Sequence, residues 1–387
     1  MPAVGMVGAG QLARMTASAA VGLGATFRVL AGSEAESAAL VTHDVAVGSH
    51  LSLPDLAKFA GACDVITFDH EHVPTDHLVA LESAGVLVRP GPGALRYTQD
   101  KLAMRERLAS LGLPVPRFAP VASAAEVTES AVAAGGSSGA WPVVLKAISG
   151  GYDGKGVWVC RTPAEAEEVL SHGLPLIAEE FVPFEAELAA LVARSPFGQG
   201  AAYPVVQTVQ RDGICREVIA PAPGLSRELA IEAQEMALRI ARSLGVAGLL
   251  AVELFETSRG ILINELAMRP HNSGHWTIEG ARTSQFEQHL RAVLDLPLGS
   301  PSGAVPGGFT VMANVLGGTD PDIYDRYIHV MAADPGVKVH FYGKAVSPGR
   351  KIGHVTVVGN AADEVAGLRD RARRAASYLR WGTEDGD

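Results

Sequence analysis

Two glutamates are the residues of this chain whose spacing most clearly suggests chemistry. Glu253 and Glu265 each lie in a short, largely apolar run, and the residues between the runs, 258–260, are typical of a tight turn. If the runs pair as a hairpin, both carboxylates can face the same side. Carboxylates so placed, beside the amide of Asn264, suit magnesium that also holds nucleotide phosphates.

The segment that follows this pair is rich in hydrogen-bond donors. Arg269, His271 and Asn272 carry guanidinium, imidazole and amide groups that suit a small anion. His271 and His275 also have the i,i+4 spacing of zinc ligands. However, the His-Glu-x-x-His pattern is absent and Glu279 is not a convincing third ligand. An anion site is therefore the favoured interpretation, and zinc is the alternative.

A lysine-bearing strand leads into a glycine-rich loop. Lys146 ends the apolar stretch 143–146, and the loop Gly150-Gly151-Tyr152-Asp153-Gly154-Lys155-Gly156 follows. Glycines let backbone amides approach a polyphosphate closely, and lysines supply charge. The loop is not a Walker motif, because no Gly-Lys-Ser/Thr opens a helix. A simple hairpin turn is the alternative, although Lys is seldom buried on an apolar strand without a partner.

Acidic residues follow another predicted strand, 175–178. Glu179 and Glu180, with the backbone of Phe181 and Val182, are placed to receive an adenine amino group and ribose hydroxyls. Solvated surface charge is the alternative for either glutamate taken alone. This segment supports nucleotide binding only in combination with the glycine-rich loop.

Near the N-terminus, a glycine-rich turn lies between a predicted strand and a predicted helix. The amides of Gly10, Gln11 and Leu12 are candidates to hold a phosphate at the helix start. A dinucleotide fingerprint would place an acidic residue after the next strand, where Leu30-Ala31-Gly32 stands instead. Substrate-phosphate binding is thus favoured over NAD binding, and tight packing of helix on strand remains an alternative.

Two further loops carry polar groups to positions that suit a ligand. Glu71 follows the predicted strand 64–68, and doubly wound sheets bind ligands at such strand ends. Near the C-terminus, Lys344, Arg350 and Lys351 share a Gly/Pro-rich turn, where three cations suit a phosphate monoester. A solvated loop between strands is the alternative for this turn.

The elements that position these residues begin with an alternating pattern over residues 3–90. Short apolar strands alternate with helices, which predicts a doubly wound parallel sheet with helices on both faces. The predicted strands are 4–7, 27–30, 45–47, 64–68 and 86–88, and the predicted helices are 11–21, 53–60 and 75–83.

The rest of the chain predicts a mostly antiparallel sheet and a smaller C-terminal unit. The predicted elements are a helix over 98–111, strands over 187–192 and 205–209, and a long helix over 227–244 before the glutamate hairpin. A Gly/Pro-rich passage then marks a linker or loop. The expected architecture is α/β, with domains over residues 1–97, 98–300 and 301–387.

Composition narrows the function classes. The 387 residues are 48% apolar and 19% charged, as in globular enzymes, and the formal net charge of −10 argues against a general nucleic-acid-binding surface. Cys63, Cys160 and Cys215 are far apart, without metal-ligand spacing, and are expected to stay reduced. No signal-peptide pattern and no membrane-length apolar run is found. We therefore expect a cytoplasmic enzyme without a membrane partner.

Taken together, these segments resemble the ATP-grasp superfamily, and within it the N5-carboxyaminoimidazole ribonucleotide synthetases of purine biosynthesis. The resemblance covers nearly the whole chain, and its most specific parts are 150–156, 264–276, 284–292 and 350–354. It implies a pre-ATP-grasp domain, a central ATP-grasp domain with ATP between two sheets, and a small C-terminal domain. A homodimer is usual in this family.

The reaction that the resemblance implies is an ATP-dependent ligation. Bicarbonate attacks the γ-phosphate of ATP to give carboxyphosphate, and the amine of 5-aminoimidazole ribonucleotide captures this intermediate or the CO₂ released from it. ADP and phosphate are the other products. Positioning and charge neutralisation carry such phosphoryl transfer, which fits a site of carboxylates, lysines and glycines.

With the candidates above, the resemblance gives four sets of site residues. Mg²⁺ is expected on Glu253 and Glu265. The ATP-binding set is Arg96, Lys146, Gly151, Tyr152, Asp153, Gly154, Lys155, Gly156, Glu179, Glu180, Phe181, Val182, Glu187, Gln210, Asn264 and Glu265. The ribonucleotide-binding set is Gly10, Gln11, Leu12, Glu71, Tyr152, Asp153, Arg269, Lys344, Arg350 and Lys351. The catalytic set, matched to the bicarbonate region, is Arg269, His271 and Asn272.

Three positions depart from the family pattern. Met268 stands where proline is usual, Gln210 where histidine is frequent, and Ala189 where serine is common. The competing readings are a carboxylate–amine ligase that uses formate or an amino acid, a non-catalytic nucleotide sensor, and an NAD-dependent oxidoreductase. Magnesium-dependent ATP hydrolysis, phosphate release with each candidate acid, and an NAD titration discriminate among them.

Overall fold

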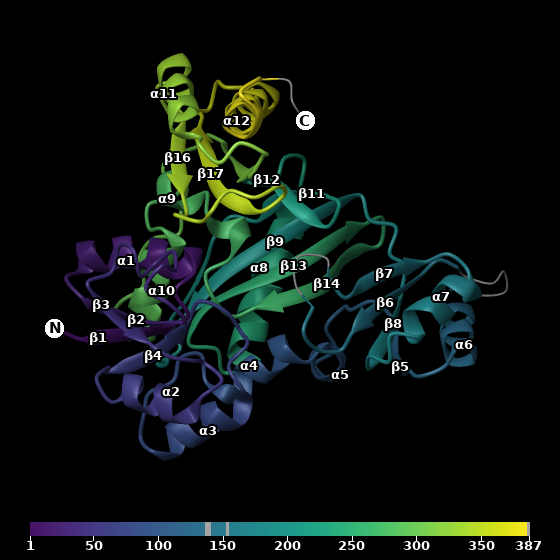
Figure 1. The fold of residues 1–387 in the computed structure, drawn as a ribbon. Coiled ribbons are helices and arrows are strands. Elements are labelled where there is room, and N and C mark those ends of the chain that lie inside the picture. The colour runs from purple at the N-terminus through teal and green to yellow at the C-terminus, as the bar shows by residue number, and fades with distance from the viewer. Residues whose placement is uncertain (136–140, 152–154, 385–387) are drawn as a thin grey trace.

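The structure is a computed structural model that describes residues 1–135, 141–151 and 155–384. Its strands form three sheets, which lie in the three regions seen in Figure 1. The sheet near the N-terminus is parallel, whereas the other two are antiparallel. The predicted α/β architecture is therefore confirmed.

The first sheet has the strand order β3-β2-β1-β4. Its elements are β1 (Ala3–Val7), α1 (Gln11–Leu23), β2 (Thr26–Ala31), β3 (Asp44–Val47), α2 (Leu53–Ala60), β4 (Val65–Phe68) and α3 (Thr75–Ser83). Helix α1 ends at Gly24, whose φ of 65° is the left-handed conformation that glycine favours. The predicted strand over 86–88 is not formed, since only Val88 makes an isolated bridge, to Ile66.

The prediction of one continuous helix over 98–111 is wrong, because two helices meet within that range. Helix α4 (Pro92–Gln99) ends before Asp100, and α5 (Lys101–Ser110) begins after it. Asp100 has extended backbone angles, and its carboxylate accepts a hydrogen bond of 2.8 Å from the amide of Ala103. The interruption places Lys101 in the first turn of α5.

The second sheet has the order β5-β8-β6-β7 and carries the residues that flank the glycine-rich loop. Its elements are β5 (Phe118–Val121), α6 (Ala124–Gly135), β6 (Val143–Ala147), β7 (Val157–Cys160), α7 (Pro163–Leu170) and β8 (Leu176–Glu180). Buried residues from β6, β8 and the helices form their own core cluster. In Figure 1 this unit lies to the side of the largest sheet.

The largest sheet follows the path β14-β13-β9-β11-β12-β15-β17-β16, and β10 pairs with β9. Its central part comprises β9 (Ala186–Arg194), β10 (Gly200–Ala202), β11 (Val206–Arg211), β12 (Ile214–Ala220), α8 (Arg227–Ser243), β13 (Gly248–Thr257) and β14 (Gly260–Ala267). Short helical segments follow at η1 (Asn272–Gly274), α9 (Thr277–Gly280) and α10 (Gln285–Val293). The strands predicted over 187–192 and 205–209 and the long helix predicted over 227–244 are present.

The C-terminal unit continues this same sheet. It contains β15 (Thr310–Leu316), α11 (Tyr324–Ala333), β16 (Lys338–Phe341), β17 (Lys351–Val358) and α12 (Val365–Trp381). Strand β15 pairs antiparallel with β12, from Glu217 opposite Ala313 to Ala220 opposite Thr310. The C-terminal unit is thus hydrogen-bonded to the central part of the chain through β15.

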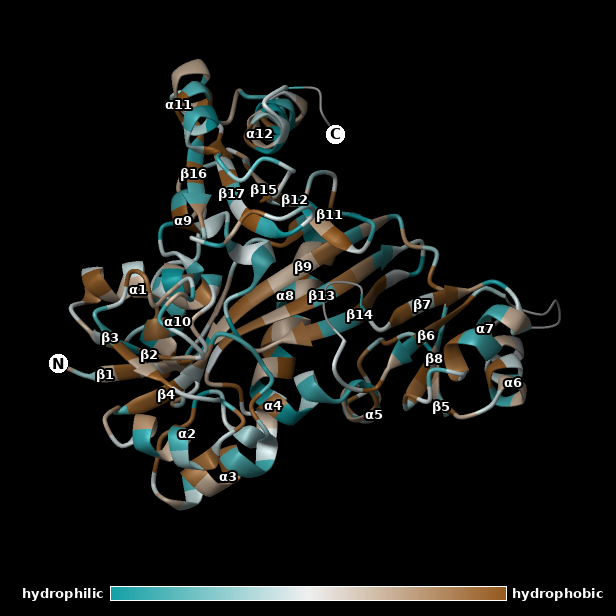
Figure 2. Ribbon diagram, in the orientation of Figure 1, coloured by the Kyte–Doolittle hydropathy of each residue, from teal (hydrophilic) through white to brown (hydrophobic). Residues whose placement is uncertain are grey.

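Apolar side chains gather on the strands. Figure 2 shows β9 and β13 mostly in brown, whereas α12 alternates between hydrophobic and hydrophilic residues. The buried core includes the central residues of these strands, among them Leu191, Val192, Leu250 and Val252. Among the described residues, no helix is both long and apolar enough to cross a membrane.

Candidate active site

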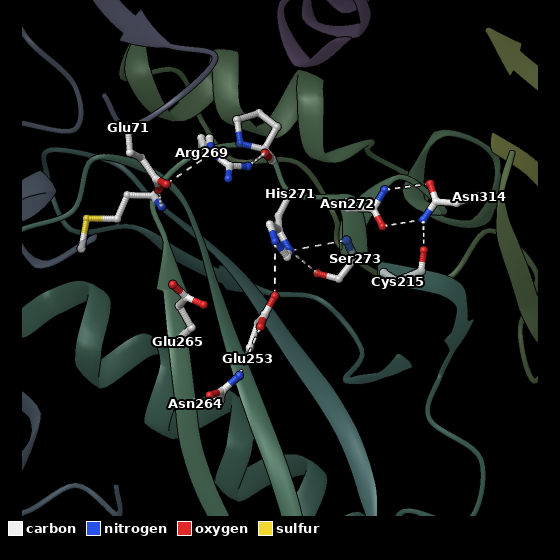
Figure 3. Close-up of polar contacts among 12 residues, drawn as sticks. Glu71, Cys215, Glu253, Asn264, Glu265, Arg269, His271, Asn272, Ser273 and Asn314 are labelled. Carbon is white, nitrogen blue, oxygen red and sulfur yellow. Dashed lines mark hydrogen bonds and ion pairs between the residues drawn. The ribbon is translucent and has the colours of Figure 1, made fainter. Parts of the chain in front are cut away.

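The predicted glutamate hairpin is present, and its register brings the two carboxylates together. Strands β13 and β14 pair antiparallel with Glu253 directly opposite Glu265. Side chains of directly opposed residues in an antiparallel pair lie on the same face of the sheet. A register shift follows between Glu253 and Leu254. Figure 3 shows both side chains on the same side of the hairpin, below the loop that carries His271.

An ammonium and an imidazole lie against this carboxylate pair. The ammonium of Lys101 forms an ion pair with Glu265, and Nε2 of His271 lies 3.4 Å from Oε1 of Glu253. Burial and the charge of Glu265 raise the pKa of Glu253 to about 7. Burial also opposes ionisation of Glu265, but Lys101 outweighs it and lowers the pKa of that carboxyl. Two carboxyl groups face one another here, and a divalent cation would stabilise the form in which both are ionised.

A buried ion network lies beneath the pair. Nε of Arg105 donates to Glu179 at 2.6 Å, and Lys146 lies 2.8 Å from the same carboxylate. Arg105 is fully buried and also donates to the carbonyl of Asn264 at 2.7 Å. Burial raises the pKa of Glu179, but Arg105 and Lys146 outweigh it and lower the pKa to about 2. The network joins α5, β6, β8 and β14, so it ties the second sheet to the glutamate hairpin.

Lys146 is shared between this network and the cleft. Its ammonium donates to the side-chain oxygen of Asn264 at 3.1 Å. Burial is the main reason why its pKa is lowered, with Glu179 acting in the opposite direction. The ammonium of Lys146 is therefore placed where it can bind a phosphate in the cleft and keep its ion pair with Glu179.

An acidic side chain and two aromatic rings also line the cleft. Burial raises the pKa of Glu187 to about 7. The rings of Phe184 and Phe255 stack with centroids 4.8 Å apart. Flat apolar rings beside a polar strand end are typical of a pocket for a purine base.

The loop after β14 is anchored to the first domain. Glu71 accepts a hydrogen bond of 2.7 Å from the amide of Met268 and lies 3.4 Å from the guanidinium of Arg269. The amide of Asn272 exchanges two hydrogen bonds with Asn314, at 3.0 and 2.8 Å. Both pairings are drawn in Figure 3. Residues of the predicted catalytic set thus depend on partners from other parts of the chain for their positions.

The N-terminal glycine turn already holds a carboxylate. Asp69, which follows β4, accepts hydrogen bonds from the amides of Gly10 at 3.0 Å and Ala13 at 2.7 Å. A side chain at Gly10 would collide with this carboxylate. The amide of Gly10 is therefore committed to Asp69, and the side chain of Gln11 is the part of this turn that reaches Lys344, at 2.7 Å.

A single cleft of about 870 Å³ brings most of the predicted residues together. Those that line it are Gly10, Gln11, Leu12, Glu71, Lys146, Gly151, Glu179, Glu180, Phe181, Val182, Glu187, Gln210, Glu253, Asn264, Glu265, Arg269, His271, Asn272, Lys344 and Lys351. Arg96, Lys155, Gly156 and Arg350 are not among the lining residues, and Arg96 and Arg350 are exposed. Tyr152, Asp153 and Gly154 lie outside the described residues.

Several residues of the site were not predicted from sequence. Lys101, Arg105 and Asp69 each contact a predicted residue through side chains that are far away in sequence. The side chain of Gln285 is fully buried. It accepts a hydrogen bond from the backbone amide of His271 and donates one to the backbone carbonyl of His271. The signal for Lys101 and Arg105 is weak, because both belong to a helix whose charged residues read as a solvated face.

Three family models match the chain in succession. The ribonucleotide synthetase preATP-grasp domain matches residues 1–99, the ATP-grasp domain matches 106–286, and the phosphoribosylaminoimidazole carboxylase C-terminal domain matches 310–367. The first match covers the parallel sheet. The second covers the second sheet and the central part of the largest sheet, and the third covers most of the C-terminal unit.

Characterised relatives and solved structures agree with the family models. The N5-carboxyaminoimidazole ribonucleotide synthase of Mycobacterium tuberculosis is 54% identical, with 98% of this chain and 88% of the relative covered. That of Corynebacterium ammoniagenes is 49% identical, with 98% and 92% covered. The crystal structure of the synthetase from Thermus thermophilus has a TM-score of 0.86 at 38% identity, with 98% of each chain covered. The synthase from Aspergillus clavatus, in complex with ADP and 5-aminoimidazole ribonucleotide, has a TM-score of 0.87 at 31% identity, also with 98% of each chain covered.

Proposed function

This chain belongs to the N5-carboxyaminoimidazole ribonucleotide synthases of the ATP-grasp superfamily, and we propose that its cleft carries out their reaction through carboxyphosphate. It is an ATP-dependent ligase of purine biosynthesis that carboxylates 5-aminoimidazole ribonucleotide. The observation that carries the mechanistic proposal is the facing pair Glu253 and Glu265 beneath Arg269 and His271. The substrates are inferred from family membership, and the roles of individual residues are inferred from this geometry.

The nucleotide is proposed to lie between the second sheet and the glutamate hairpin. Its base would pack near Phe184 and Phe255, and Glu187 would serve the ribose. Lys146 and the glycine-rich loop would neutralise the phosphates. Lys101 is added to this set in place of the exposed Arg96, because its ammonium already lies against Glu265. The ADP complex of the Aspergillus clavatus relative supports a nucleotide in this fold.

A magnesium ion fits the donor set at the hairpin. Glu253, Glu265 and the amide oxygen of Asn264 are oxygen ligands of the kind that Mg²⁺ takes, and Glu265 already holds a cation in the form of Lys101. Among the described residues, no three His, Cys, Asp or Glu side chains are grouped to hold a metal by themselves. Substrate phosphates would therefore complete the coordination. When bound, the ion would neutralise charge on the transferring phosphoryl group.

Arg269 and His271 are proposed to hold bicarbonate in line with the γ-phosphate. An oxygen of bicarbonate attacks phosphorus, the bond to ADP breaks, and carboxyphosphate forms. Burial lowers the pKa of His271 to about 3, so the imidazole is neutral and donates a single N–H rather than a charge. The permanent charge of Arg269 is held toward the cleft by Glu71.

The amine of the ribonucleotide is proposed to capture the carboxyl group next. The new C–N bond forms as the C–O bond to phosphate breaks, and phosphate leaves with that oxygen. Direct attack on carboxyphosphate and capture of released CO₂ give the same products. Lys344 and Lys351, which line the cleft, would receive the phosphate of the ribonucleotide. A homodimer in the cytoplasm is part of this proposal and rests on family membership alone.

The experiment that tests the proposal is a coupled ADP assay with ATP and 5-aminoimidazole ribonucleotide supplied and bicarbonate withheld. ADP formation should depend on bicarbonate, and formate or an amino acid should not replace it. Equal ADP formation without bicarbonate would contradict the assignment. Faster turnover with formate would favour the related carboxylate–amine ligase instead.

A further inference from the structure

Two asparagines from distant parts of the chain form a reciprocal pair beside the cleft. Nδ2 of Asn314 donates to the side-chain oxygen of Asn272 at 2.8 Å, and Nδ2 of Asn272 donates to the side-chain oxygen of Asn314 at 3.0 Å. Figure 3 shows the two amide groups facing one another. Asn272 begins η1 and lines the cleft, whereas Asn314 belongs to β15 and is only 5% exposed. The pair therefore joins the C-terminal unit to the proposed anion site.

The backbone of Cys215 fixes the orientation of the Asn314 amide. The β12–β15 pairing begins with Glu217 opposite Ala313, so the carbonyl of Cys215 lies beyond the end of this ladder. Nδ2 of Asn314 donates to that carbonyl at 2.9 Å. Reversing the amide would set its oxygen against the carbonyl oxygen, and two acceptors cannot form a hydrogen bond. The nitrogen of Asn314 therefore faces Cys215.

The orientation of Asn272 follows from that of Asn314. If the amide of Asn272 alone were reversed, its oxygen would face the oxygen of Asn314, and its nitrogen would face the nitrogen of Asn314. Both hydrogen bonds of the pair would then be lost, and the buried polar groups of Asn314 would lose their partners on Asn272. The side-chain oxygen of Asn272 is therefore held toward β15.

The second N–H of Asn272 is the part of this side chain that is left for a ligand. In a reciprocal amide pair, each amide uses the N–H on the same side as its own oxygen, and its second N–H points outward. The outward N–H of Asn314 meets Cys215, but none of the described residues accepts a hydrogen bond from the outward N–H of Asn272. The loop also contains Arg269, whose buried Nε lies 3.4 Å from Glu71 and has no hydrogen-bond partner in the described part of the chain. This loop thus offers donors to a ligand in the cleft.

We propose that Asn314 is a positioning residue, which sets the amide of Asn272 so that an N–H rather than the oxygen is offered to the anion. The inference rests on the proposed function, which identifies the anion as bicarbonate. An N–H donates to an oxygen of bicarbonate, whereas an amide oxygen in the same place would repel it. Asn272 is then a binding residue for bicarbonate. Capping the end of the β12–β15 ladder needs only the bond from Asn314 to Cys215, so it does not account for the pairing with Asn272.

Steady-state kinetics of the intact enzyme test whether Asn314 acts through Asn272. Asn272→Ala removes the donor, and Asn314→Leu keeps the approximate shape of the side chain but removes its hydrogen bonds. Each variant should raise the KM for bicarbonate at least about tenfold and the KM for ATP less than about twofold. The double variant should exceed Asn272→Ala by less than about twofold, because Asn314 has no effect once its target is gone.

Thr356→Val is the matched control for Asn314→Leu. Thr356 is fully buried on β17, the strand next to β15, and its hydroxyl has no hydrogen-bond partner among the described residues. Both KM values should therefore stay within about twofold of those of the unmodified enzyme. A KM for bicarbonate that is unchanged in Asn272→Ala would overturn the donor role. Equal rises for ATP and bicarbonate in Asn314→Leu, or effects that multiply in the double variant, would overturn the positioning role.

NMR of the side-chain amides decides the inference even if Asn314→Leu fails to fold. The chain contains four asparagines, Asn264, Asn272, Asn314 and Asn360, so ¹⁵N-asparagine labelling gives only four side-chain NH₂ groups to resolve. Those of Asn272 are assigned from their loss in Asn272→Ala. Sodium bicarbonate, added together with ADP, should shift one N–H signal of Asn272 more than the other, because only the outward N–H is free to donate. Signals that both stay in place, or that shift equally, would overturn the proposal.

The two experiments separate this inference from the proposed function. An unmodified enzyme that forms ADP equally well without bicarbonate would contradict the proposed function. The NMR titration would then still decide whether Asn272 offers its outward N–H to bicarbonate. Normal bicarbonate-dependent turnover together with unshifted Asn272 signals would leave the proposed function intact and overturn the role of Asn314.

Discussion

At the residue scale, the proposed chemistry depends on Glu253 and Glu265, which stand directly opposite one another in the β13–β14 hairpin. Glu253 and Glu265 lie in runs with strand-like composition on either side of a turn, so facing side chains followed from hairpin geometry. Lys101 and Asp69 were missed because their roles come from contacts between distant segments. Arg96 was assigned to ATP by resemblance, yet it is exposed and stacks on Tyr97, with the guanidinium 5.1 Å from the ring centroid. Lys101, five positions later, forms an ion pair with Glu265 instead.

Replacing Glu265 tests the metal-site proposal at this scale. Glu265→Gln keeps the size of the side chain but removes its charge, so bicarbonate-dependent ADP formation should fall by at least about a hundredfold. Glu256→Gln, on the same hairpin but away from the cleft lining, is the matched control and should keep nearly full turnover. A Glu265→Gln enzyme as active as the control would remove the carboxylate pair from the mechanism.

The raised pKa of Glu253 makes a prediction about pH in the absence of metal. The folded state holds the proton of this carboxyl up to about pH 7, whereas the unfolded chain releases it near its ordinary value. Its contribution to the free energy of unfolding is therefore complete below about pH 4.5 and is lost as pH rises through about 7. Thermal unfolding in EDTA should show a steeper decline over this range than in Glu253→Gln. Parallel pH profiles of the two proteins would contradict the assignment.

At the element scale, the hairpin depends on a buried ion network that no local pattern reveals. Arg105 joins α5 to Glu179 on β8 and to the backbone of β14. The strands themselves were predictable from short, largely apolar runs. The ion network that joins the second sheet to the hairpin was not predictable. In the sequence, a buried arginine looks like any other charged residue of a helix until the packing is known.

Glu179→Gln tests this network. The substitution leaves the fully buried Arg105 without a counter-charge, so the free energy of unfolding should fall by about 3–5 kcal/mol. The neighbouring Glu180 is the control, since its partner Arg117 is 3.7 Å away and 59% exposed. Glu180→Gln should change stability by less than about 1 kcal/mol in urea unfolding. Equal effects of the two substitutions would show that the network is not the link between the sheets.

At the scale of the whole molecule, the C-terminal unit is an extension of the central sheet. The Gly/Pro-rich passage before it predicted a linker or loop and, after it, a smaller C-terminal unit. The pairing of β15 with β12 could not be predicted, because it depends on register between segments far apart in the chain. Lys344 and Lys351, which line the cleft and are proposed to bind the ribonucleotide phosphate, belong to this extension.

Truncation after residue 300 tests that continuity. Removal of β15–β17 exposes the edge of β12 and the apolar side chain of Ile219, which packs in the C-terminal core. We expect the fragment 1–300 to aggregate or unfold when expressed alone, as measured by size-exclusion chromatography and circular dichroism. A monomeric, cooperatively folded fragment would show that the central part does not need the pairing.

The transfer of oxygen from bicarbonate to phosphate tests the central claim most directly. Bicarbonate labelled with ¹⁸O is supplied with ATP and 5-aminoimidazole ribonucleotide, and the released phosphate is analysed by mass spectrometry. Attack of bicarbonate on the γ-phosphate predicts one ¹⁸O atom in each phosphate, because the C–O bond breaks while the P–O bond is retained. Phosphate that carries oxygen only from water and ATP, during normal formation of the carboxylated product, would contradict the account.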